Sequence, residues 1–549
     1  MMKMEIWQKR YPDIGFFLSF FPYKKRNLSR DSLRLEKWLQ EQNLAEVEVL
    51  YVIGLIGFAL PKILLNWLAE KKQRALIFVE EDLGAFAAFQ GEEMLLNPQI
   101  HFHYAQKDSI DALAEMFPID RLAIFEGKPF DAALLKRKAA TISALYSDVL
   151  YSHAIVENVL TNFTRLSGCF DARGKFENIP AVICGAGPSL SKTIPVLKEV
   201  SEKALIFAGG SAITALTRFG VQPHFSMALD PNDEEFDRLR QSCYFEGPFL
   251  FAPRLHRDVF CVMNGPFGYL KSDTGGLIEQ FFEKELGISG EAVGPDLGPE
   301  AFSVTTLMVA HAFAMGCNPI LFAGVDLAYT GNARYAKGIE AEETGADDPR
   351  ALEERLLRED IHGNEVATLL KWVMEADCVS AFAKKQPQVK FFNCTDGGIG
   401  FAGMKNVPLS EALRSIPPQD LRGRIHQWIQ SSPLQFKEKK LPDLVAHLEA
   451  SLKRCETLCV EIIQLLENES QSGKLALCQS DFADEKAYSI LLEGIDIALT
   501  QILFRYYPHL DPQEGKRASE IAKYRELKRQ IGMFSDILQK QRIPCTNIS

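Results

Sequence analysis

The sequence predicts an α/β protein in which two series of strands and helices precede a helical region. Short apolar runs rich in β-branched residues end in glycine or a polar residue, and each leads into a segment with helical spacing of apolar residues. This alternation is typical of parallel strands joined by crossover helices. From residue 409 onward only the helical spacing continues. We therefore expect an N-terminal α/β domain at 1–135, a central α/β domain with a parallel sheet at 136–415 and a C-terminal helical bundle at 416–549.

Composition narrows the class of protein. The chain carries 61 Lys and Arg against 72 Asp and Glu, and 47% of its residues are hydrophobic. This balance is typical of a globular protein and disfavours one that coats a nucleic acid polymer, which needs surplus positive charge. The apolar run 49–60 is too short to span a membrane, and the 11 cysteines have no framework spacing. We expect a cytoplasmic protein with reduced thiols, no secretory signal and no transmembrane segment.

The N-terminal series begins with a strand pattern at 47–53 that ends at Gly54. A helical pattern at 58–68 follows, and a second strand pattern at 75–79 ends before Glu80. This is the order of a nucleotide-type βαβ unit. The turn after the first strand lacks one glycine of the dinucleotide fingerprint. We therefore favour a glycine turn that only lets the helix pack on the sheet over a nucleotide or methyl-donor site.

The central series has more distinct strand ends. Four apolar runs, at 180–184, 204–208, 224–229 and 319–323, are followed by GAGPSL, GGS, DPN and GVD respectively. The carboxyl ends of parallel strands share one edge of a sheet, where such sheets bind ligands. Polar and glycine residues at four strand ends therefore predict a ligand site at that edge.

The first of these turns has a mechanism for holding phosphate. Gly185 and Gly187 lack Cβ atoms, so their N–H groups can approach an anion closely. Pro188 suits the start of a helix, and Ser189 adds a hydroxyl beside the positive helix end. We expect Gly187→Val to leave the fold largely intact and to block the anion. Alternatively, the turns only connect strands to helices.

The second and third turns would complete the site. Gly210 and Ser211 supply another small turn with exposed donors, and Asp230 and Asn232 could bind a ribose, a base edge or a divalent cation. A further strand pattern at 389–393 is followed by Thr395, Gly397 and Gly398, which form another turn at a strand end.

Over residues 150–415 the chain resembles the motility-associated (Maf-type) glycosyltransferases and the MptE-like 6-hydroxymethylpterin pyrophosphokinases. The resemblance rests on PAVICGAGPSL, FAGGSAITALTRFGVQPHFSMALDPN, GCNPILFAGVDLAYTG and FNCTDGGIGFAG. The flanking regions fit the layout of the bacterial Maf proteins better than the short MptE chain. The first string is also similar to the nucleotide-binding turn of bacterial sialyltransferases.

The resemblance implies a Rossmann-like central domain that binds a nucleotide or nucleotide-sugar donor. A Maf-type enzyme would transfer a nonulosonic, sialic-acid-like sugar from a CMP donor to Ser or Thr of a protein acceptor. An MptE-like enzyme would instead transfer pyrophosphate from ATP to 6-hydroxymethyl-dihydropterin. The implied nucleotide-binding residues are Gly185, Gly187, Pro188, Ser189, Gly210, Ser211, Asp230, Asn232, Thr395 and Gly397.

Three residues are candidates for catalysis: Asp326, Asp296 and Tyr335. Asp326 would contact the acceptor or a metal, and Tyr335 would donate to the departing phosphate. Asp296, like Glu300, precedes a helix and is a candidate base, although such carboxylates also complement a helix dipole.

Two departures from the family pattern open a third interpretation. Val325 replaces a Gln before the Asp, and Tyr335 stands where a His often follows. His362 could act instead, although a lone His before a Gly is more typical of a solvated loop. The chain could therefore be a nucleotide-binding interaction protein without catalysis, whose helical region docks a partner, dimerises or only caps the fold. The sequence shows no D-x-D string flanked by strand residues, so we expect no obligatory cofactor, and Mg²⁺ only alongside a nucleotide.

Overall fold

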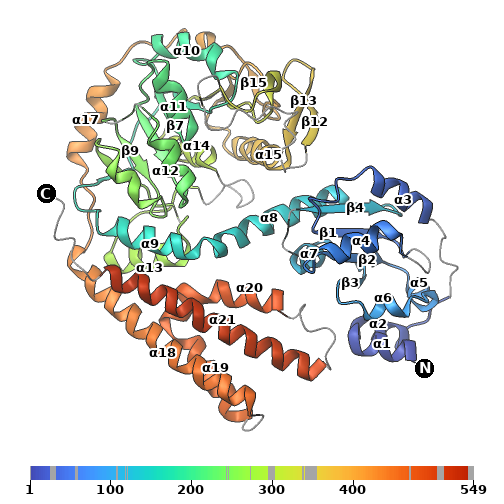
Figure 1. Ribbon diagram of the computed structural model, residues 1–549. Coiled ribbons are helices and arrows are strands. Elements are labelled where there is room, and N and C mark those ends of the chain that lie inside the picture. The colour runs from blue at the N-terminus through green and yellow to red at the C-terminus, as the bar shows by residue number, and fades with distance from the viewer. Residues whose placement is uncertain are drawn as a thin grey trace. The chain divides into compact units, whose positions relative to one another are not determined.

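The computed structural model (Figure 1) describes residues 2–24, 32–55, 60–106, 109–117, 119, 121–242, 244, 246–272, 274–294, 303–336, 339, 355–468, 472–503 and 512–541. It confirms the α/β fold with parallel sheets and a helical C-terminal region. The chain forms two compact units. One comprises Met1–Val149, Glu456–Phe482 and Leu492–Arg529, and the other comprises Leu150–Cys455, Ala483–Leu491 and Gln530–Ser549. The three-domain division stays a prediction.

The first unit contains a parallel sheet of four strands in the order β3-β2-β1-β4. The strands are β1 Val49–Ile53, β2 Ala75–Glu80, β3 Ile100–Tyr104 and β4 Leu122–Glu126. Every residue of β1 and β2 is buried, because helices cover both faces. Leu64 and Trp67 of α4 (Lys62–Glu70) pack on one face, and Leu113 and Phe117, of α7 (Ser109–Met116) and just after it, pack on the other.

The remaining helices of this part are α1 Met2–Arg10, α2 Pro12–Phe20, α3 Ser32–Gln40, α5 Leu83–Ala88, α6 Glu92–Leu96 and α8 Ala132–Leu150. Glu80, at the end of β2, is only 2% exposed. It accepts hydrogen bonds from the backbone N–H groups of Leu55, Glu81 and Asp82 and forms an ion pair with Lys128. This carboxylate therefore ties the glycine turn after β1 to its surroundings. Residues 56–59, where we expected the following helix to begin, lie outside the described residues.

The second unit is built on a sheet of nine strands in the order β15-β14-β11-β6-β7-β8-β9-β10-β5. All neighbouring pairs are parallel. The strands are β5 Phe170–Asp171, β6 Ala181–Cys184, β7 Leu205–Gly209, β8 Phe225–Ala228, β9 Phe249–Phe251, β10 Phe267–Tyr269, β11 Ile320–Ala323, β14 Phe391–Asn393 and β15 Lys405–Asn406. From β6 the chain adds strands on one side and then returns to place β11 on the other. The strand order therefore reverses between β6 and β11, where doubly wound sheets bind ligands.

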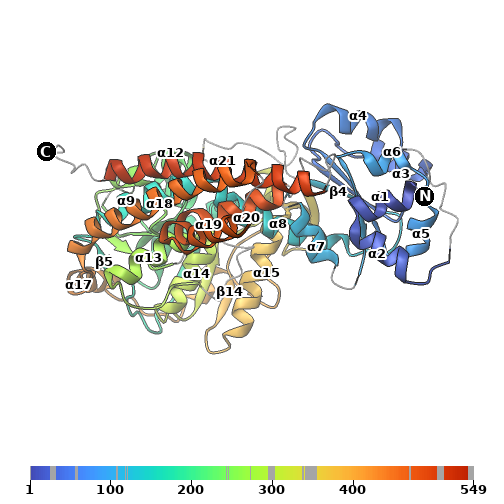
Figure 2. The same ribbon diagram turned by 90° about the horizontal axis from the view of Figure 1, so that it is seen from below.

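Helices join these strands and enclose a core centred on the sheet. They are α9 Ser152–Phe163, α10 Leu190–Glu199, α11 Ser211–Arg218, α12 Asp233–Leu239, α13 Gly276–Leu286, α14 Val304–Ala314, α15 Leu370–Lys385, α16 Leu409–Ala412 and α17 Leu421–Ser431. Helices α14 and α15 are neighbours in both views (Figures 1 and 2), and a ring contact joins Phe313 to Phe382. Short 3₁₀ turns lie at Arg257–Cys261, Thr330–Asn332 and Glu438–Lys440.

An antiparallel hairpin also belongs to this unit, and the sequence patterns did not predict it. It pairs β12 (Arg355–Glu359) with β13 (Glu365–Leu369).

The C-terminal helices are α18 Leu441–Glu467, α19 Ser472–Asp484, a π turn at Tyr488–Leu492, α20 Glu493–Leu503 and α21 Pro512–Gln541. Among the helices of the described ranges, none has the length and apolarity needed to cross a membrane.

Candidate functional site

The carboxyl ends of β6 and β11 are tied together by backbone hydrogen bonds. Gly185 N–H donates to Ala323 O at 2.9 Å, and Gly187 N–H donates to Gly324 O at 2.8 Å. The turn Gly185–Ser189 therefore lies against the strand end that carries Asp326. The structure thus brings together two predicted groups of residues at the point where the strand order reverses.

Asp326 is 2% exposed and occupies the N-terminal end of α10. Its Oδ1 accepts a hydrogen bond from the Ser189 hydroxyl at 2.6 Å, and its Oδ2 accepts one from the Ser189 N–H at 3.3 Å. Burial raises the pKa of Asp326, and the Ser189 hydrogen bonds oppose that rise. The carboxylate thus sits where positive helix ends favour an anion, which is the place we expected for phosphate.

Gly187 is needed for this arrangement. A Cβ atom there would lie 2.6 Å from Asp326 Cγ and closer still to Oδ1. The expectation that Gly187→Val would leave the fold largely intact stays a prediction, but the structure shows that the new side chain would collide with Asp326. The N–H groups of Gly185, Gly187 and Ser189 all donate within the protein. Pro188 has no N–H to offer. Phosphate binding by this turn stays a prediction. It would require Asp326 to move away from the Ser189 N–H, and the N–H groups of Gly185 and Gly187 to leave the carbonyls of Ala323 and Gly324.

The loop after β14 closes around Asp326 from the other side. Thr395 Oγ1 accepts a hydrogen bond from Val325 N–H at 3.1 Å, and Ile399 N–H donates to Asp326 O at 3.0 Å. A Cβ atom on Gly398 would lie 2.5 Å from Asp326 Cα, and one on Gly397 would lie 3.3 Å from Oδ2. The structure therefore places Thr395 and Gly397 beside Asp326, although their ligand contacts stay a prediction.

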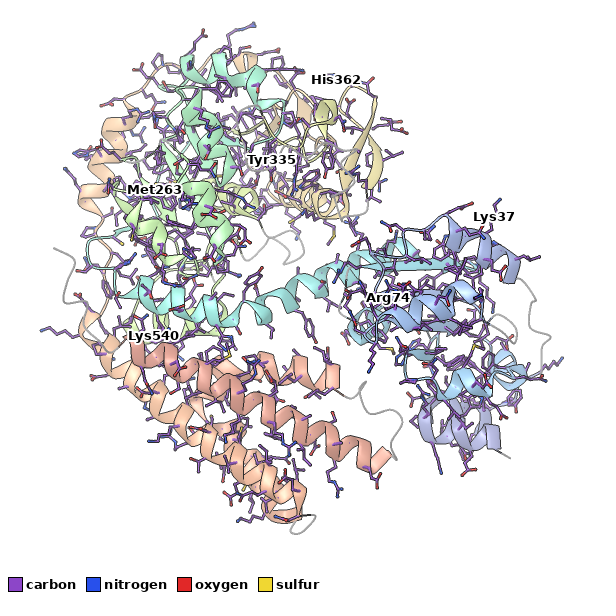
Figure 3. All side chains as sticks on the ribbon, viewed as in Figure 1. Lys37, Arg74, Met263, Tyr335, His362 and Lys540 are labelled. Atoms are coloured by element: carbon purple, nitrogen blue, oxygen red, sulfur yellow. The ribbon has the colours of Figure 1, made fainter. Side chains whose placement is uncertain are left out.

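A row of charged side chains borders this loop. Lys192 Nζ lies 2.9 Å from Asp396 Oδ2, and His362 Nε2 lies 3.3 Å from Asp396 Oδ1. His362 stands in the hairpin between β12 and β13, and Ile361 N–H fixes that hairpin by donating to Gly398 O at 3.0 Å. The His362 side chain is half exposed, and the Asp396 carboxylate orients its ring. The local sequence did not indicate this contact. Figure 3 labels His362 and Tyr335 in this unit.

The ends of β7 and β8 form the other part of the edge. Gly210 has a φ of 49° and precedes α11, which opens with Ser211. Asn232 Oδ1 accepts a hydrogen bond from Glu235 N–H at 3.1 Å and so caps α12. This cap accounts for Asn232, and its role in ligand binding stays a prediction, as do those of Gly210, Ser211 and Asp230.

Glu235 is a residue of this edge that the sequence analysis missed. It is 3% exposed, and both carboxylate oxygens lie 3.9 Å from the position of a Cβ on Gly210. Burial, and then the charge of Asp230, raise the pKa of Glu235 to about 7, while Arg238 at 3.4 Å opposes the rise. The only signal for Glu235 in the sequence was its position three residues after Asn232, which caps α12. From this position in the first turn, the Glu235 side chain turns back toward the strand ends.

Ser303 and Glu375 meet at the start of α14. Ser303 Oγ accepts a hydrogen bond from Thr306 N–H at 3.1 Å and donates one to Glu375 Oε1 at 2.8 Å. Burial raises the pKa of Glu375 to about 7. Glu375 was also missed, because on a helix a single Glu is usually solvated. The predicted Asp296, with Glu300, lies outside the described residues.

The loop after β11 carries Tyr335 next to Arg334. Ala336 N–H donates to Ala186 O at 2.8 Å, so this loop contacts the Gly185–Ser189 turn. Tyr335 is partly buried, and its ring lies 5.3 Å from Arg334 Cζ. Within the ranges the structure describes, no three His, Cys, Asp or Glu side chains are grouped so as to hold a metal ion.

Comparison with known proteins shows what the chain is similar to. Residues 153–332 match the family model described as 6-hydroxymethylpterin diphosphokinase MptE-like. No curated protein sequence matches the chain. Among solved structures, the Maf glycosyltransferase from Magnetospirillum magneticum AMB-1 is similar, with a TM-score of 0.53 and 15% sequence identity. The alignment covers 99% of this chain and 96% of that one. The resemblance found in the sequence is thus confirmed: residues 153–332 match the MptE-like family, in a chain that shares the fold of a Maf glycosyltransferase.

Proposed function

We propose that the protein is a Maf-type glycosyltransferase that moves a nonulosonic sugar from a CMP donor to Ser or Thr of a protein. The observation that carries this proposal is the correspondence with the Maf glycosyltransferase along 99% of this chain. It extends on both sides of the MptE-like region at 153–332. A protein that had only borrowed the nucleotide-binding domain would not share the flanking parts as well.

The charges at the carboxyl edge suggest how a donor would lie there. The carboxyl group of Glu235 lies beside Gly210, and the charge of Asp230 acts on it. Carboxylates suit the hydroxyl groups of a ribose or an amino group on a base and repel phosphate. We therefore place the nucleoside at the ends of β7 and β8. The phosphate and sugar would lie nearer the ends of β6 and β11, where Ser189 donates to the Asp326 carboxylate and Lys192 pairs with that of Asp396.

Transfer of the sugar requires a base for the acceptor. The acceptor oxygen forms a bond to the anomeric carbon, while the bond from that carbon to the phosphate oxygen breaks and its electron pair stays on the phosphate. The hydroxyl proton must leave the acceptor. His362 suits this task because Asp396 orients its ring, and because its exposure gives a protein acceptor access. Asp326 would position the turn through Ser189 and not act as the base.

The match to the MptE-like family model favours one second candidate. In that case ATP, with Mg²⁺, would bind at the same edge. The pterin hydroxymethyl oxygen would attack the β-phosphorus, and AMP would leave with the electron pair of the broken bond. Both reactions need a nucleotide at this edge, so they differ in the base and the metal.

The first experiment is a thermal-shift panel with CMP, CDP, ATP, AMP and GTP, each with and without Mg²⁺. A ligand at 100 times its dissociation constant adds about 2.7 kcal/mol of apparent stability. Stabilisation by CMP or CDP without metal supports the sugar transferase. Stabilisation by ATP only with Mg²⁺ replaces it with the pyrophosphokinase. No stabilisation by any nucleotide contradicts both and leaves an interaction protein without catalysis.

A transfer assay then tests the assignment of the base. The donor is a CMP-linked nonulosonic acid, and the acceptor is a Ser/Thr-rich peptide or protein analysed by mass spectrometry. The matched control for His362→Ala is His426→Ala, since His426 is an exposed histidine on α17 that contacts Gln430. Loss of transfer in the first variant alone supports the assignment.

A further inference from the structure

The turn at the tip of the β12–β13 hairpin determines which backbone groups of β12 face β13. Asp360 N–H donates to Asn364 O at 2.7 Å, and Gly363 N–H donates to Asp360 O at 3.0 Å. Asp360 and Asn364 are thus a hydrogen-bonded pair, and in an antiparallel ladder such pairs alternate with pairs that are not bonded to each other. Going back along β12, the next bonded pair is therefore Arg358 with Val366, which lie opposite each other.

Leu357 and Glu359 therefore turn their N–H and C=O groups toward the outer edge of β12. The same alternation turns Ala367 of β13 toward the opposite edge, where its carbonyl accepts the Tyr329 N–H at 2.8 Å. On the outer edge, the Arg358 side chain donates to Leu357 O at 3.0 Å. Within the part of the chain that the structure describes, no group bonds to the N–H of Leu357 or Glu359. One edge of the hairpin is thus covered, and the other is open.

The sequence of β12 does not protect this open edge. Proteins often prevent pairing at an exposed edge with a proline, a bulge or lysine side chains. The strand reads RLLRE, and its register with β13 is one to one, without a bulge. Leu357 is 59% exposed, so a large apolar side chain stands next to an unpaired N–H. An edge of this kind can accept an extended peptide as a further strand.

The open edge leads to the candidate functional site. At the tip of the hairpin, Ile361 N–H donates to Gly398 O, in the loop that closes around Asp326. His362 lies in the same turn (Figure 3). At about 3.3 Å per strand residue, a segment paired with Leu357 runs roughly 10 Å before it reaches this turn. A Ser or Thr about three or four residues along that segment therefore arrives beside His362.

We propose that the outer edge of β12 binds an extended segment of the acceptor protein as an added strand, and so presents a Ser or Thr of that segment to His362. This inference rests on the proposed sugar transfer and adds how the acceptor is recognised. Because main-chain groups make the contacts, the edge selects an extended segment and tolerates varied side chains. The other occupant that fits an open edge is β12 of a second copy of this chain, and the test separates the two.

Leu357→Pro tests the edge without removing a bond to β13. Proline deletes the outward N–H and places its ring where the added strand would lie, whereas Leu356 and Arg358 on either side keep their bonds to β13. The matched control is Leu357→Thr, which keeps the N–H and also removes the leucine side chain. The probe is a capped synthetic peptide in which Thr alternates with Val. Fluorescence anisotropy measures its binding to the whole chain, and thermal unfolding reports whether each variant folds.

A second measurement leaves the protein unchanged. Two forms of the peptide carry the same number of N-methyl groups, placed either on alternate residues or on consecutive residues. Backbone N–H groups of an extended chain point to opposite sides in turn. Methylation of alternate residues therefore leaves one edge of the peptide free to pair, and methylation of consecutive residues blocks both edges. Only the first form should bind.

We expect Leu357→Pro to weaken peptide binding by about tenfold or more and Leu357→Thr to weaken it less, with CMP affinity unchanged in both. If Leu357→Pro does not fold, the two methylated peptides decide the question. Equal affinity for these peptides would overturn the inference, as would unchanged peptide affinity in folded Leu357→Pro or no peptide binding by the wild type.

The oligomeric state and the transfer assay complete the test. If the wild type is a dimer and Leu357→Pro is a monomer, the edge pairs with a second copy and the inference fails. If the peptide binds through this edge but never receives a sugar, the strand-addition site stands and the proposed function fails. If the peptide receives a sugar with the same KM in Leu357→Pro and the wild type, the proposed function stands and the inference fails.

Discussion

Gly187→Ala provides a sharp test of the strand-end arrangement. The new Cβ would lie 2.6 Å from Asp326 Cγ and 2.8 Å from Asp326 Cβ. Carbon atoms in contact are normally about 3.5–4.0 Å apart, so Asp326 must move by roughly an ångström. Such a shift breaks the two Ser189 hydrogen bonds, of 2.6 and 3.3 Å. Hydrogen bonds to a charged group contribute about 1.5–3 kcal/mol each. We therefore expect the free energy of unfolding to fall by ~3–6 kcal/mol.

Urea unfolding followed by circular dichroism measures this change. The control is Gly532→Ala, since Gly532 lies in α21 and a Cβ there would meet no atom within 4 Å. That change should stabilise the helix by about 0.5–1 kcal/mol. In an Asp326→Gly background, where Oδ1, Cγ and Cβ are all absent, the cost of Gly187→Ala should decrease substantially. An unfolding free energy for Gly187→Ala within about 0.5 kcal/mol of the wild type would refute the role given to this glycine.

Three further predictions concern titration and catalysis. Because the pKa of Glu235 is raised to about 7 from its ordinary 4.5, the folded state binds the extra proton between these values, and stability should fall as the pH rises through that window. Between pH 5 and pH 8 the free energy of unfolding should fall less in Glu235→Gln than in the wild type. An equal fall in both would contradict the link between Glu235 titration and stability. His311 is 1% exposed, and burial lowers its pKa from 6.5 to about 4. Stability should therefore decrease as the pH falls from 6.5 toward 4, and thermal unfolding of His311→Leu should show a weaker acid dependence than the wild type. His362→Ala should reduce sugar transfer by about 10²–10⁴-fold without changing CMP affinity, and loss of both in calorimetry and transfer assays would show a structural role instead.

Local patterns were enough to predict the strand ends. The buried runs that became β6, β7, β8 and β11 were recognisable because each is short, apolar and punctuated by glycine or a polar residue. The parallel arrangement then placed those ends on one edge. Chain order alone does not show that β11 pairs with β6. The contact between Asp326 and Ser189 depends on that pairing, so it could not be predicted either.

Other residues of the edge were not predicted from the local sequence. Glu235, Glu375 and Lys192 lie in helices, where charged residues usually face water. Glu235 is placed by the cap at the start of α12, and Glu375 by its contact with Ser303 at the start of α14. Lys192 is placed by its ion pair with Asp396, in a loop far along the chain. The place of the loop that carries Tyr335 also depends on the fold, because Ala336 N–H donates to Ala186 O.

The hydrogen bond between Ser189 and Asp326 joins residues 137 positions apart, which bears on how the chain assembles. Contacts between distant residues form late, because closing the intervening segment costs entropy before any contact compensates for it. While the chain is being synthesised, α10 emerges long before the carboxylate that will occupy its N-terminal end. A fragment that stops before β11 at Ile320–Ala323 could thus form several neighbouring strands yet never assemble the edge. The carboxyl edge can therefore be completed only after β11 and Asp326 have been synthesised.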